Sequence, residues 1–268
     1  MRPFSSTHSL KPKPSFADVW LVPSEQQTRR GGMPPGTDCV VIDTLRASSS
    51  MLAALAQGAA GVVPVRTIEE ALAWRRRAPD ALLAGERGGW KIDSKLTGGA
   101  PFDLGNSPRE FLRAPLQGRL VVMTTTNGTK AVHAARGARR IRIAALANVG
   151  ATAECLLRHP PERLLLICAG TGSEAALEDI LTAGALLDRL LEARPGIPCS
   201  DAALLARAVY RTMRGDLPGA LARSANGRRL LDRPELREDV EWCARADRYA
   251  FCAAVDGEGV VRIGEGGD

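Results

Sequence analysis

The stretch Leu82-Leu83-Ala84-Gly85-Glu86-Arg87-Gly88-Gly89-Trp90, with Phe102-Asp103-Leu104-Gly105-Asn106-Ser107-Pro108 downstream, decides the fold of this chain. A short apolar run, typical of a buried strand, leads into a glycine-rich loop that carries Glu86 and Arg87. Downstream, Ser107-Pro108-Arg109-Glu110 reads as a capping box with proline at the first helical position, which predicts a helix start. A long loop inside a compact domain is usually functional or disordered, and these polar residues follow a strand end. We therefore expect them to bind a ligand.

Three other segments repeat this pattern of an apolar strand followed by polar residues. They are Val40-Val41-Ile42 before Asp43-Thr44-Leu45-Arg46, Leu120-Val121-Val122-Met123 before Thr124-Thr125-Thr126-Asn127-Gly128-Thr129, and Leu164-Leu165-Leu166-Ile167 before Cys168-Ala169-Gly170 and then Glu178-Asp179. Alternation of strands with helix-like segments predicts an α/β fold of three layers, α/β/α, with a parallel-rich sheet covered by helices on both faces. Ligands of such sheets bind at the carboxyl ends of the strands. The four polar loops are therefore predicted to meet along one edge.

The length of 268 residues allows one large α/β domain or two small ones. We expect residues 1–16 to be a disordered N-terminal lead-in. Residues 17–148 are predicted to form an N-terminal α/β lobe and residues 149–268 a C-terminal α/β lobe, with both lobes acting as one functional unit. The clearest helix is predicted over residues 177–191, and the pattern becomes mainly helical after Pro195.

Composition and charge argue against several classes of protein. No apolar run approaches the roughly 18 residues that span a bilayer, and the polar N-terminus lacks the core of a signal peptide. We therefore expect a cytoplasmic protein with no membrane partner. The net charge of +6 is scattered and lacks interleaved aromatic residues, so a solvated surface and no nucleic-acid partner are expected. The six cysteines show no Cys-x-x-Cys spacing, which favours buried thiols over a zinc site or disulfides, and a homo-oligomer is left open.

Asp43 is the first candidate for chemistry, because a carboxylate at the end of a buried strand is costly unless it is paired or binds a metal ion. The alternative is an aspartate in a turn or helix cap. Leu45 occupies the second acidic position of the Asp-x-Asp phosphatase signature, so an aspartyl-phosphate mechanism is not implied. Glu86 and Arg87 offer an anion and a cation on one loop, and the alternative there is a solvent-exposed ion pair. Mg²⁺ typically takes one or two carboxylates plus waters and phosphate oxygens, which Asp43 and Glu86 would satisfy.

The loop of residues 124–129 places hydroxyl and amide groups at a strand-to-helix junction, where anions bind readily. A plain Asn-Gly turn with capping threonines fits the same residues, and no Walker lysine follows that would indicate ATP. Residues 170–175 formally match a dinucleotide fingerprint, but the second strand with its acidic end is missing, which argues against a dinucleotide. Glu178 and Asp179 either join the metal site or complement the dipole of the helix they begin, and the sequence leaves both open.

Taken together, these motifs resemble the 2-phosphosulfolactate phosphatase family of Mg²⁺-dependent enzymes in coenzyme M biosynthesis. The resemblance runs from about Val19 to Arg262, with the motifs in the family's order. The matching segments are residues 41–47, 85–89, 102–108, 124–129, 168–170 and 177–179. Two departures stand out, since residues 94–100 look like an insertion and Asn226 stands in a stretch where relatives often carry histidine.

The resemblance implies a phosphoric monoester hydrolase that converts (2R)-2-phospho-3-sulfolactate and water to 3-sulfolactate and phosphate, with Mg²⁺ as cofactor. Its substrate is a small polyanionic phosphoester, and we assign Arg46 and Arg87 to the phosphate or the sulfonate. A phosphatase of this fold that acts on another small 2-phospho-carboxylate is one alternative. A non-catalytic anion-binding paralogue is the other.

The resemblance and the motifs together give a set of expected site residues. The expected catalytic residues are Asp43, Arg46, Glu86 and Arg87. The expected metal ligands are Asp43, Glu86, Glu178 and Asp179. The expected substrate-binding residues are Asn106, Ser107, Thr124, Thr125, Thr126, Asn127, Gly128 and Gly170. One carboxylate would orient or activate the attacking water.

Overall fold

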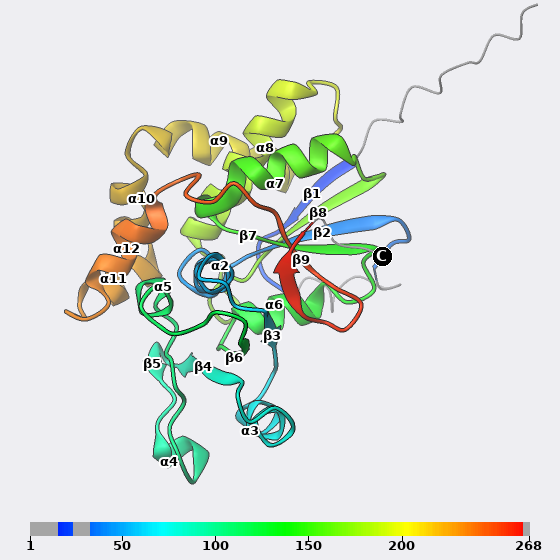
Figure 1. The fold of residues 1–268 in the computed structure, drawn as a ribbon. Helices are drawn as coiled ribbons and strands as arrows, with labels where there is room; N and C mark the ends of the chain where they lie inside the picture. The colour runs from blue at the N-terminus through cyan, green and yellow to red at the C-terminus, as the bar shows by residue number, and fades with distance from the viewer. Residues whose placement is uncertain (1–15, 24–32, 265–268) are drawn as a thin grey trace, which may run out of the picture.

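The strands within the described residues join one mixed sheet of ten strands, with helices packed around it (Figure 1). The structure is a computed structural model and describes residues 16–23 and 33–264. In spatial order the strands are β1 (Phe16–Trp20), β8 (Arg163–Cys168), β2 (Thr37–Ile42), β7 (Arg140–Ala144), β9 (Ala253–Val255), β10 (Val261–Ile263), β3 (Gly61–Pro64), β6 (Leu120–Thr124), β4 (Leu82–Arg87) and β5 (Trp90–Lys91). The predicted three-layer α/β fold with a parallel-rich sheet is confirmed.

The parallel strands form two groups that run in opposite directions. Strands β1, β8, β2 and β7 are parallel to one another, and so are β3, β6 and β4. Between the groups, β9 and β10 pair antiparallel with each other and with β7 and β3, and the link to β3 is the single pair Val261–Val62. Three antiparallel steps in succession reverse the strand direction. The strands that carry the polar loops therefore belong to two opposed groups, and not to one parallel set as predicted.

The carboxyl ends of the two groups nevertheless meet. Asp43 follows β2 directly, and a Cβ placed on Gly128, just after β6, would lie 2.5 Å from Asp43 Oδ2. In a flat sheet, strands of opposite direction would hold these two ends far apart. The sheet therefore turns at the β9–β10 hairpin, and β9 stands steeply to β2 and β7 in Figure 1.

The helices mostly lie where the sequence predicts them. They are α2 (Ala47–Ala56), α3 (Ile68–Arg77), α4 (Ser94–Thr97), α5 (Pro108–Phe111), α6 (Gly128–Ala134), α7 (Val149–Arg158), α8 (Leu177–Ala193), α9 (Asp201–Met213), α10 (Leu217–Arg223), α11 (Ala225–Leu231) and α12 (Arg237–Ala244), with 3-10 turns at Leu146–Asn148 and Arg214–Asp216. Helix α8 confirms the clearest predicted helix, and α9 to α12 confirm the helical stretch after Pro195. Residues 94–100, which look like an insertion in the sequence, form α4 and the turn after it, at the far end of the molecule from β1 (Figure 1).

One predicted capping box is only half correct. Ser107 is the N-cap residue of α5 and Pro108 takes the first helical position, as expected. The Ser107 hydroxyl, however, makes no capping hydrogen bond, because it donates to Asp239 Oδ1 at 2.7 Å. The carboxylate of Glu110 instead accepts from the backbone N–H of Gly105 at 2.8 Å.

Other expectations bear on organisation and surface. Of the predicted lead-in, residues 1–15 lie outside the described residues, whereas residue 16 was wrongly included, because Phe16 begins β1. The division of the chain at residue 148 stays a prediction, and β8, which follows that boundary, lies between β1 and β2, which precede it.

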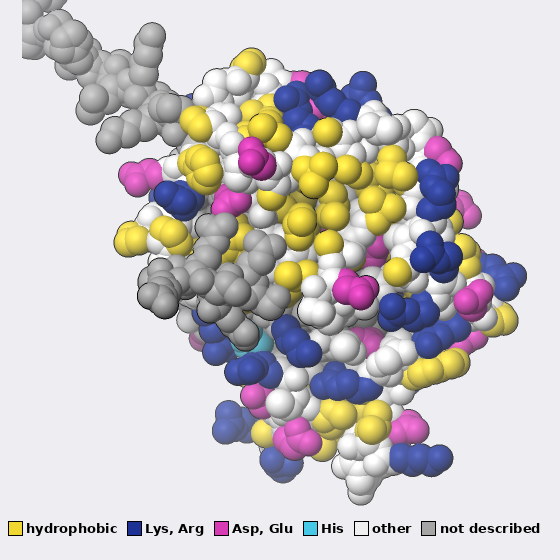
Figure 2. Space-filling model, turned by 180° about the vertical axis from the view of Figure 1, so that it is seen from behind, with side chains coloured by type: hydrophobic (Ala, Val, Ile, Leu, Met, Phe, Trp, Pro, Cys, Tyr) yellow, Lys and Arg dark blue, Asp and Glu magenta, His cyan; other side chains and the backbone are white. Residues whose placement is uncertain are grey.

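None of the six cysteines, all of them in described segments, forms a disulfide. No helix within residues 16–23 and 33–264 is long and apolar enough to cross a bilayer. On the face shown in Figure 2, Lys and Arg side chains lie in several separate groups.

Candidate active site

A pocket of about 130 Å³ lies where the loops after β2, β4, β6 and β8 meet α11 and the segment after it. Segments from distant parts of the chain therefore contribute to one cavity. The lining residues are Asp43, Leu45, Arg46, Glu86, Gly88, Gly89, Asn106, Thr126, Asn127, Thr171, Gly172, Asn226, Arg229, Leu230 and Arg233. Six of the residues predicted for the site are among them, namely Asp43, Arg46, Glu86, Asn106, Thr126 and Asn127.

Asp43 lies at the junction of β2 and α2. Its Oδ1 accepts a hydrogen bond of 3.1 Å from Ala47 N in the first turn of α2. Burial raises the pKa of Asp43 to about 7, the negative charges of Glu86 and Glu178 add to the shift, and the Ala47 hydrogen bond and Arg46 oppose it. A carboxyl group with a pKa near neutrality, in a pocket, is a strong candidate for chemistry.

Glu178 and Asp179 stand in the first turn of α8, outside the residues that line the pocket. Asp179 accepts hydrogen bonds from Thr44 N at 2.8 Å and from Gly170 N at 3.1 Å, so both of its oxygens are engaged. Burial, followed by the charges of Asp43 and Glu178, raises the pKa of Asp179 well above its usual value. Both residues therefore belong to one acidic cluster with Asp43, whatever they also contribute to the helix dipole.

One oxygen of this cluster has no partner. Glu178 Oε1 accepts from Asn226 Nδ2 at 2.6 Å, whereas the buried Oε2 has no hydrogen bond among the described residues. Asn226 Nδ2 also donates to Thr171 Oγ1 at 2.8 Å, which joins α11 to the loop after β8. In the part of the chain that the structure describes, no three His, Cys, Asp or Glu side chains form a metal site by themselves.

Glu86 holds two loops of the pocket together. Its Oε1 accepts from Thr126 N at 2.7 Å, and its Oε2 accepts from Gly89 N at 2.6 Å and from Thr126 Oγ1 at 3.2 Å. A carboxylate has about four acceptor positions, so three donors leave Glu86 about one for a ligand. Gly85 makes this arrangement possible, because its φ is +152° and a Cβ there would clash with the Thr124 carbonyl oxygen.

Arg87 does not line this pocket, and its role in binding substrate stays a prediction. Both Glu86 and Arg87 belong to β4, and successive side chains of a strand point to opposite faces. Glu86 lines the pocket, whereas Arg87 does not: it donates to the Glu86 carbonyl oxygen at 2.7 Å and to Thr124 Oγ1 at 3.0 Å. The sequence pattern had placed both residues on a flexible loop, where this alternation would not apply.

Several other predicted substrate-binding residues support the pocket without lining it. Thr125 and Thr129 exchange hydrogen bonds across the β6–α6 turn, and Gly128 lets this turn approach Asp43. Gly170, with φ +63°, passes close to the Glu174 carbonyl oxygen. The remaining predicted residues that do not line this pocket are Ser107 and Thr124.

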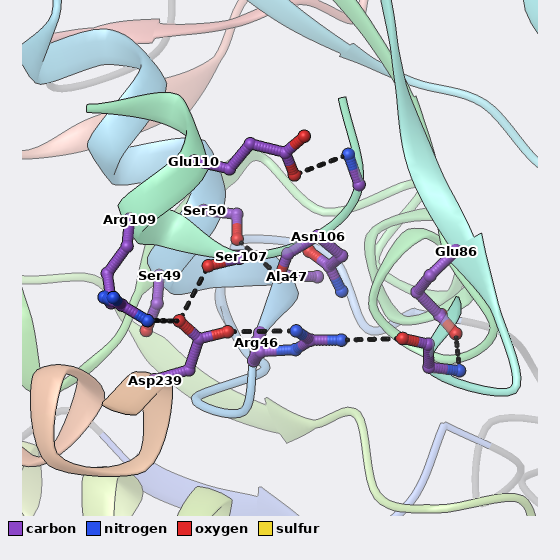
Figure 3. Close-up of polar contacts among 12 residues, drawn as sticks. Arg46, Ala47, Ser49, Ser50, Glu86, Asn106, Ser107, Arg109, Glu110 and Asp239 are labelled. Carbon is purple, nitrogen blue, oxygen red and sulfur yellow. Dashed lines mark hydrogen bonds and ion pairs between the residues drawn. The ribbon is translucent and has the colours of Figure 1, made fainter. Parts of the chain in front are cut away.

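Arg46 is fixed by an acidic residue that the sequence analysis missed (Figure 3). Its Nη1 donates to Asp239 Oδ2 at 3.0 Å and its Nη2 to the Gly89 carbonyl oxygen at 3.3 Å. The Asp239 side chain is fully buried, and Arg46 is 4% exposed. Asp239 also accepts from Ser107, and Arg109 Nη1 lies 3.8 Å from its Oδ1. In sequence, Glu238-Asp239 at the start of α12 looks like an ordinary solvated helix start, which is why Asp239 gave no signal.

Two further cations of the pocket were also missed. Arg229 in α11 and Arg233 just after it both line the cavity. Their spacing of four residues places side chains on one helix face, but in this arginine-rich chain that spacing does not stand out. Only the fold, which brings α11 against the loop after β8, separates them from the other surface arginines.

Comparison with known proteins gives one consistent answer. Residues 24–257 match the model of a family described as 2-phosphosulpholactate phosphatase. A protein of Caldicellulosiruptor saccharolyticus named probable 2-phosphosulfolactate phosphatase is 37% identical over 212 residues, 78% of this chain and 84% of that protein. Proteins of the same name from Deinococcus radiodurans and a Synechococcus strain are 42% identical over 207 residues and 38% identical over 233 residues. These two alignments cover 77% and 84% of this chain, and 82% and 90% of the respective relatives.

Proposed function

Because the chain belongs to the 2-phosphosulpholactate phosphatase family, whose members are phosphoric monoester hydrolases, we propose that it hydrolyses (2R)-2-phospho-3-sulfolactate. The products would be 3-sulfolactate and inorganic phosphate. Cytoplasmic location and assembly with further copies stay predictions from the sequence.

The observation that carries the proposal is the arrangement of opposite charges around one small pocket. Asp43, with a pKa raised to about 7, lies in the same cavity as three arginines, and Glu178 and Asp179 lie behind it. The arginines would bind the oxygens of a polyanionic phosphoester. The carboxylates would orient the attacking water or hold a cation.

The donor set fits Mg²⁺ as the cofactor. Burial and, after it, the negative charges of Glu86 and Glu178 raise the pKa of Asp43, and a bound cation would relieve that repulsion. Asp43 Oδ2 and Glu178 Oε2 make no hydrogen bond among the described residues, whereas both oxygens of Asp179 accept backbone N–H groups. Asp43 and Glu178 are therefore the residues that would hold the ion, with Glu86 contributing at most one acceptor position. When bound, Mg²⁺ would polarise a phosphoryl oxygen and acidify a bound water.

The other residues of the pocket have separate tasks. Arg46, held by Asp239 and the Gly89 carbonyl group, would present its remaining N–H groups to the phosphoryl oxygens without having to reorganise. Asn106 lines the pocket, and its buried Oδ1 has no partner among the described residues, so its amide is open to a ligand. Thr126 and Asn127 line the same wall as Glu86 and would complete the contacts to substrate oxygens.

Release of phosphate tests the proposal directly. The purified protein should release phosphate from 2-phosphosulfolactate with Mg²⁺ or Mn²⁺, and an excess of chelator should abolish turnover. Turnover of 2-phospholactate or phosphoglycerate, with none of 2-phosphosulfolactate, would instead identify a phosphatase for another 2-phospho-carboxylate. Absence of phosphate release from all three compounds would favour the non-catalytic paralogue, and full turnover in chelator would contradict the metal assignment.

A further inference from the structure

The three arginines that line the pocket differ in how far their guanidinium groups are already engaged by other groups of the protein. Arg46 is buried and paired with Asp239, so its charge is already balanced inside the protein. The pocket also contains the carboxylates of Asp43 and Glu86. The proposed Mg²⁺ would offset these carboxylates and bind the phosphoryl group, so the further acid groups of the substrate need positive charge from elsewhere than Arg46.

Arg233 is held at the rim of the pocket by the β4–β5 hairpin. Its guanidinium carbon lies 4.3 Å from the centre of the Trp90 ring, and its Nη2 donates to the Gly88 carbonyl oxygen at 3.1 Å. Trp90 is 58% exposed, which is unusual for tryptophan, and the stacked arginine covers part of its ring. Arg233 thus has a fixed position, and its charge has no carboxylate partner among the described residues.

Arg229 has no interaction partner among the described residues. It stands in α11, four residues before Arg233, its side chain is exposed, and it makes no hydrogen bond or ion pair within residues 16–23 and 33–264. Its neighbour Arg228 does not line the pocket, and its guanidinium donates to the Arg223 carbonyl oxygen. An unpaired guanidinium at the mouth of a pocket is suited to a planar or tripodal oxyanion.

We propose that Arg229, together with Arg233, binds the non-reacting acid group of the substrate, and so selects phosphoesters that carry a second strong acid over simple phosphomonoesters. The inference rests on the proposed phosphatase function and specifies its substrate class. The shared chemistry is an oxyanion, either carboxylate or sulfonate. Arg46 would then bind the phosphoryl group, and Arg229 and Arg233 would bind the acid group at the opposite end of the substrate.

The test compares Arg229→Gln with Arg228→Gln on four esters. These are 2-phosphosulfolactate, 2-phospholactate with a carboxylate only, 2-phosphooxyethanesulfonate with a sulfonate only, and ethyl phosphate with neither. A lost charged hydrogen bond should lower kcat/KM of Arg229→Gln about ten- to a hundredfold on the esters whose second acid Arg229 contacts. Activity on ethyl phosphate should change less than about twofold, since no contact is lost. Arg228→Gln should match the wild type on all four.

Each outcome decides between the alternatives. A loss confined to one of the two single-acid esters identifies the group as carboxylate or sulfonate. An equal loss on all four esters, or no loss on any, overturns the proposal. Arg233→Lys keeps the charge but loses the planar stack on Trp90, so it should fall between the wild type and Arg229→Gln on the acid esters.

Binding of 3-sulfolactate separates this proposal from the phosphatase function. This compound carries the two acid groups and no phosphate, so calorimetry measures their binding to Arg229 and Arg233 without any turnover. Wild-type protein should bind it about ten- to a hundredfold more tightly than Arg229→Gln. Wild-type protein that binds 3-sulfolactate but hydrolyses none of the esters would refute the phosphatase and leave the arginine site standing. Equal dissociation constants for the two proteins would refute the arginine site.

Discussion

Replacing Asp239 by asparagine should weaken both the fold and the site. The substitution keeps the shape of the side chain but leaves the Arg46 guanidinium, 4% exposed, without its charged partner. Breaking a buried ion pair from one side costs about 3–5 kcal/mol. Asparagine retains one acceptor oxygen, so we expect the lower end, about 3 kcal/mol. In a chain of this length that lowers Tm by roughly 6–12 °C.

The kinetic effect should come from the released arginine. In Asp239→Asn, Arg46 keeps only neutral acceptors, the Gly89 carbonyl oxygen and the amide oxygen of the new side chain, so its guanidinium is held more weakly and is free to shift by about 1 Å. Misplacement on that scale costs about a hundredfold, which we expect in kcat/KM. The matched control is Glu238→Gln, whose side chain is 71% exposed and pairs with Arg109, and it should change stability by less than about 0.5 kcal/mol.

A double variant distinguishes structural support from catalysis. Arg46→Met with Asp239→Leu removes both charges, so stability should return to within about 1 kcal/mol of the wild type, the remainder reflecting the unpaired Ser107 hydroxyl. Activity should stay lost. Urea denaturation followed by circular dichroism gives the free energies, and phosphate release gives the rates. Unchanged stability and kinetics in Asp239→Asn would refute the reasoning, and so would an active double variant.

Three further predictions follow from the same structure. Asp43→Asn should lower kcat far more than it raises KM, while Tm without metal stays equal or rises, because a repelled buried charge is removed; near-normal turnover would make Asp43 an ordinary helix-start residue. Gly85→Ala should destabilise the protein by about 2 kcal/mol or more in a urea titration, since a Cβ would meet the Thr124 carbonyl oxygen, and a change below about 0.5 kcal/mol would contradict this. Burial lowers the pKa of His133 from 6.5 to about 4, so the stability that depends on neutral His133 should be lost as pH falls from 6.5 towards 4. His133→Gln should flatten the slope of unfolding free energy against pH in that range, and an unchanged slope would exclude this role.

The parts of the fold that are encoded locally could be predicted from the sequence. The apolar runs before Asp43, Glu86 and Thr124 mark strands, and the polar residues after them mark the ends of those strands. The reversal between the two parallel groups could not be predicted, because it depends on three-residue strands near the end of the chain. Such short runs have no periodicity that gives their direction or their neighbours.

The missed site residues share one physical cause. Asp239, Arg229 and Arg233 belong to α11, α12 and the segment between them, where charged residues usually face water. Their importance comes from long-range packing, since Asp239 and Arg46 are 193 residues apart. Arg87 was misplaced for a local reason, because the glycines around it suggested a loop while the backbone continues as a strand. Strand alternation then sends adjacent residues in opposite directions.

The β9–β10 hairpin also determines when the site can be assembled during synthesis. A chain growing from its N-terminus makes Asp43, Glu86 and Asn127 early. These residues lie at the ends of strands from the two parallel groups, and the β9–β10 hairpin connects those groups. Arg229, Asp239 and then residues 253–263 emerge only afterwards. Until they do, Arg46 lacks its counter-ion and the two groups lack the strands that join them. The nascent protein therefore carries its acidic loops well before it can bind an anion between them.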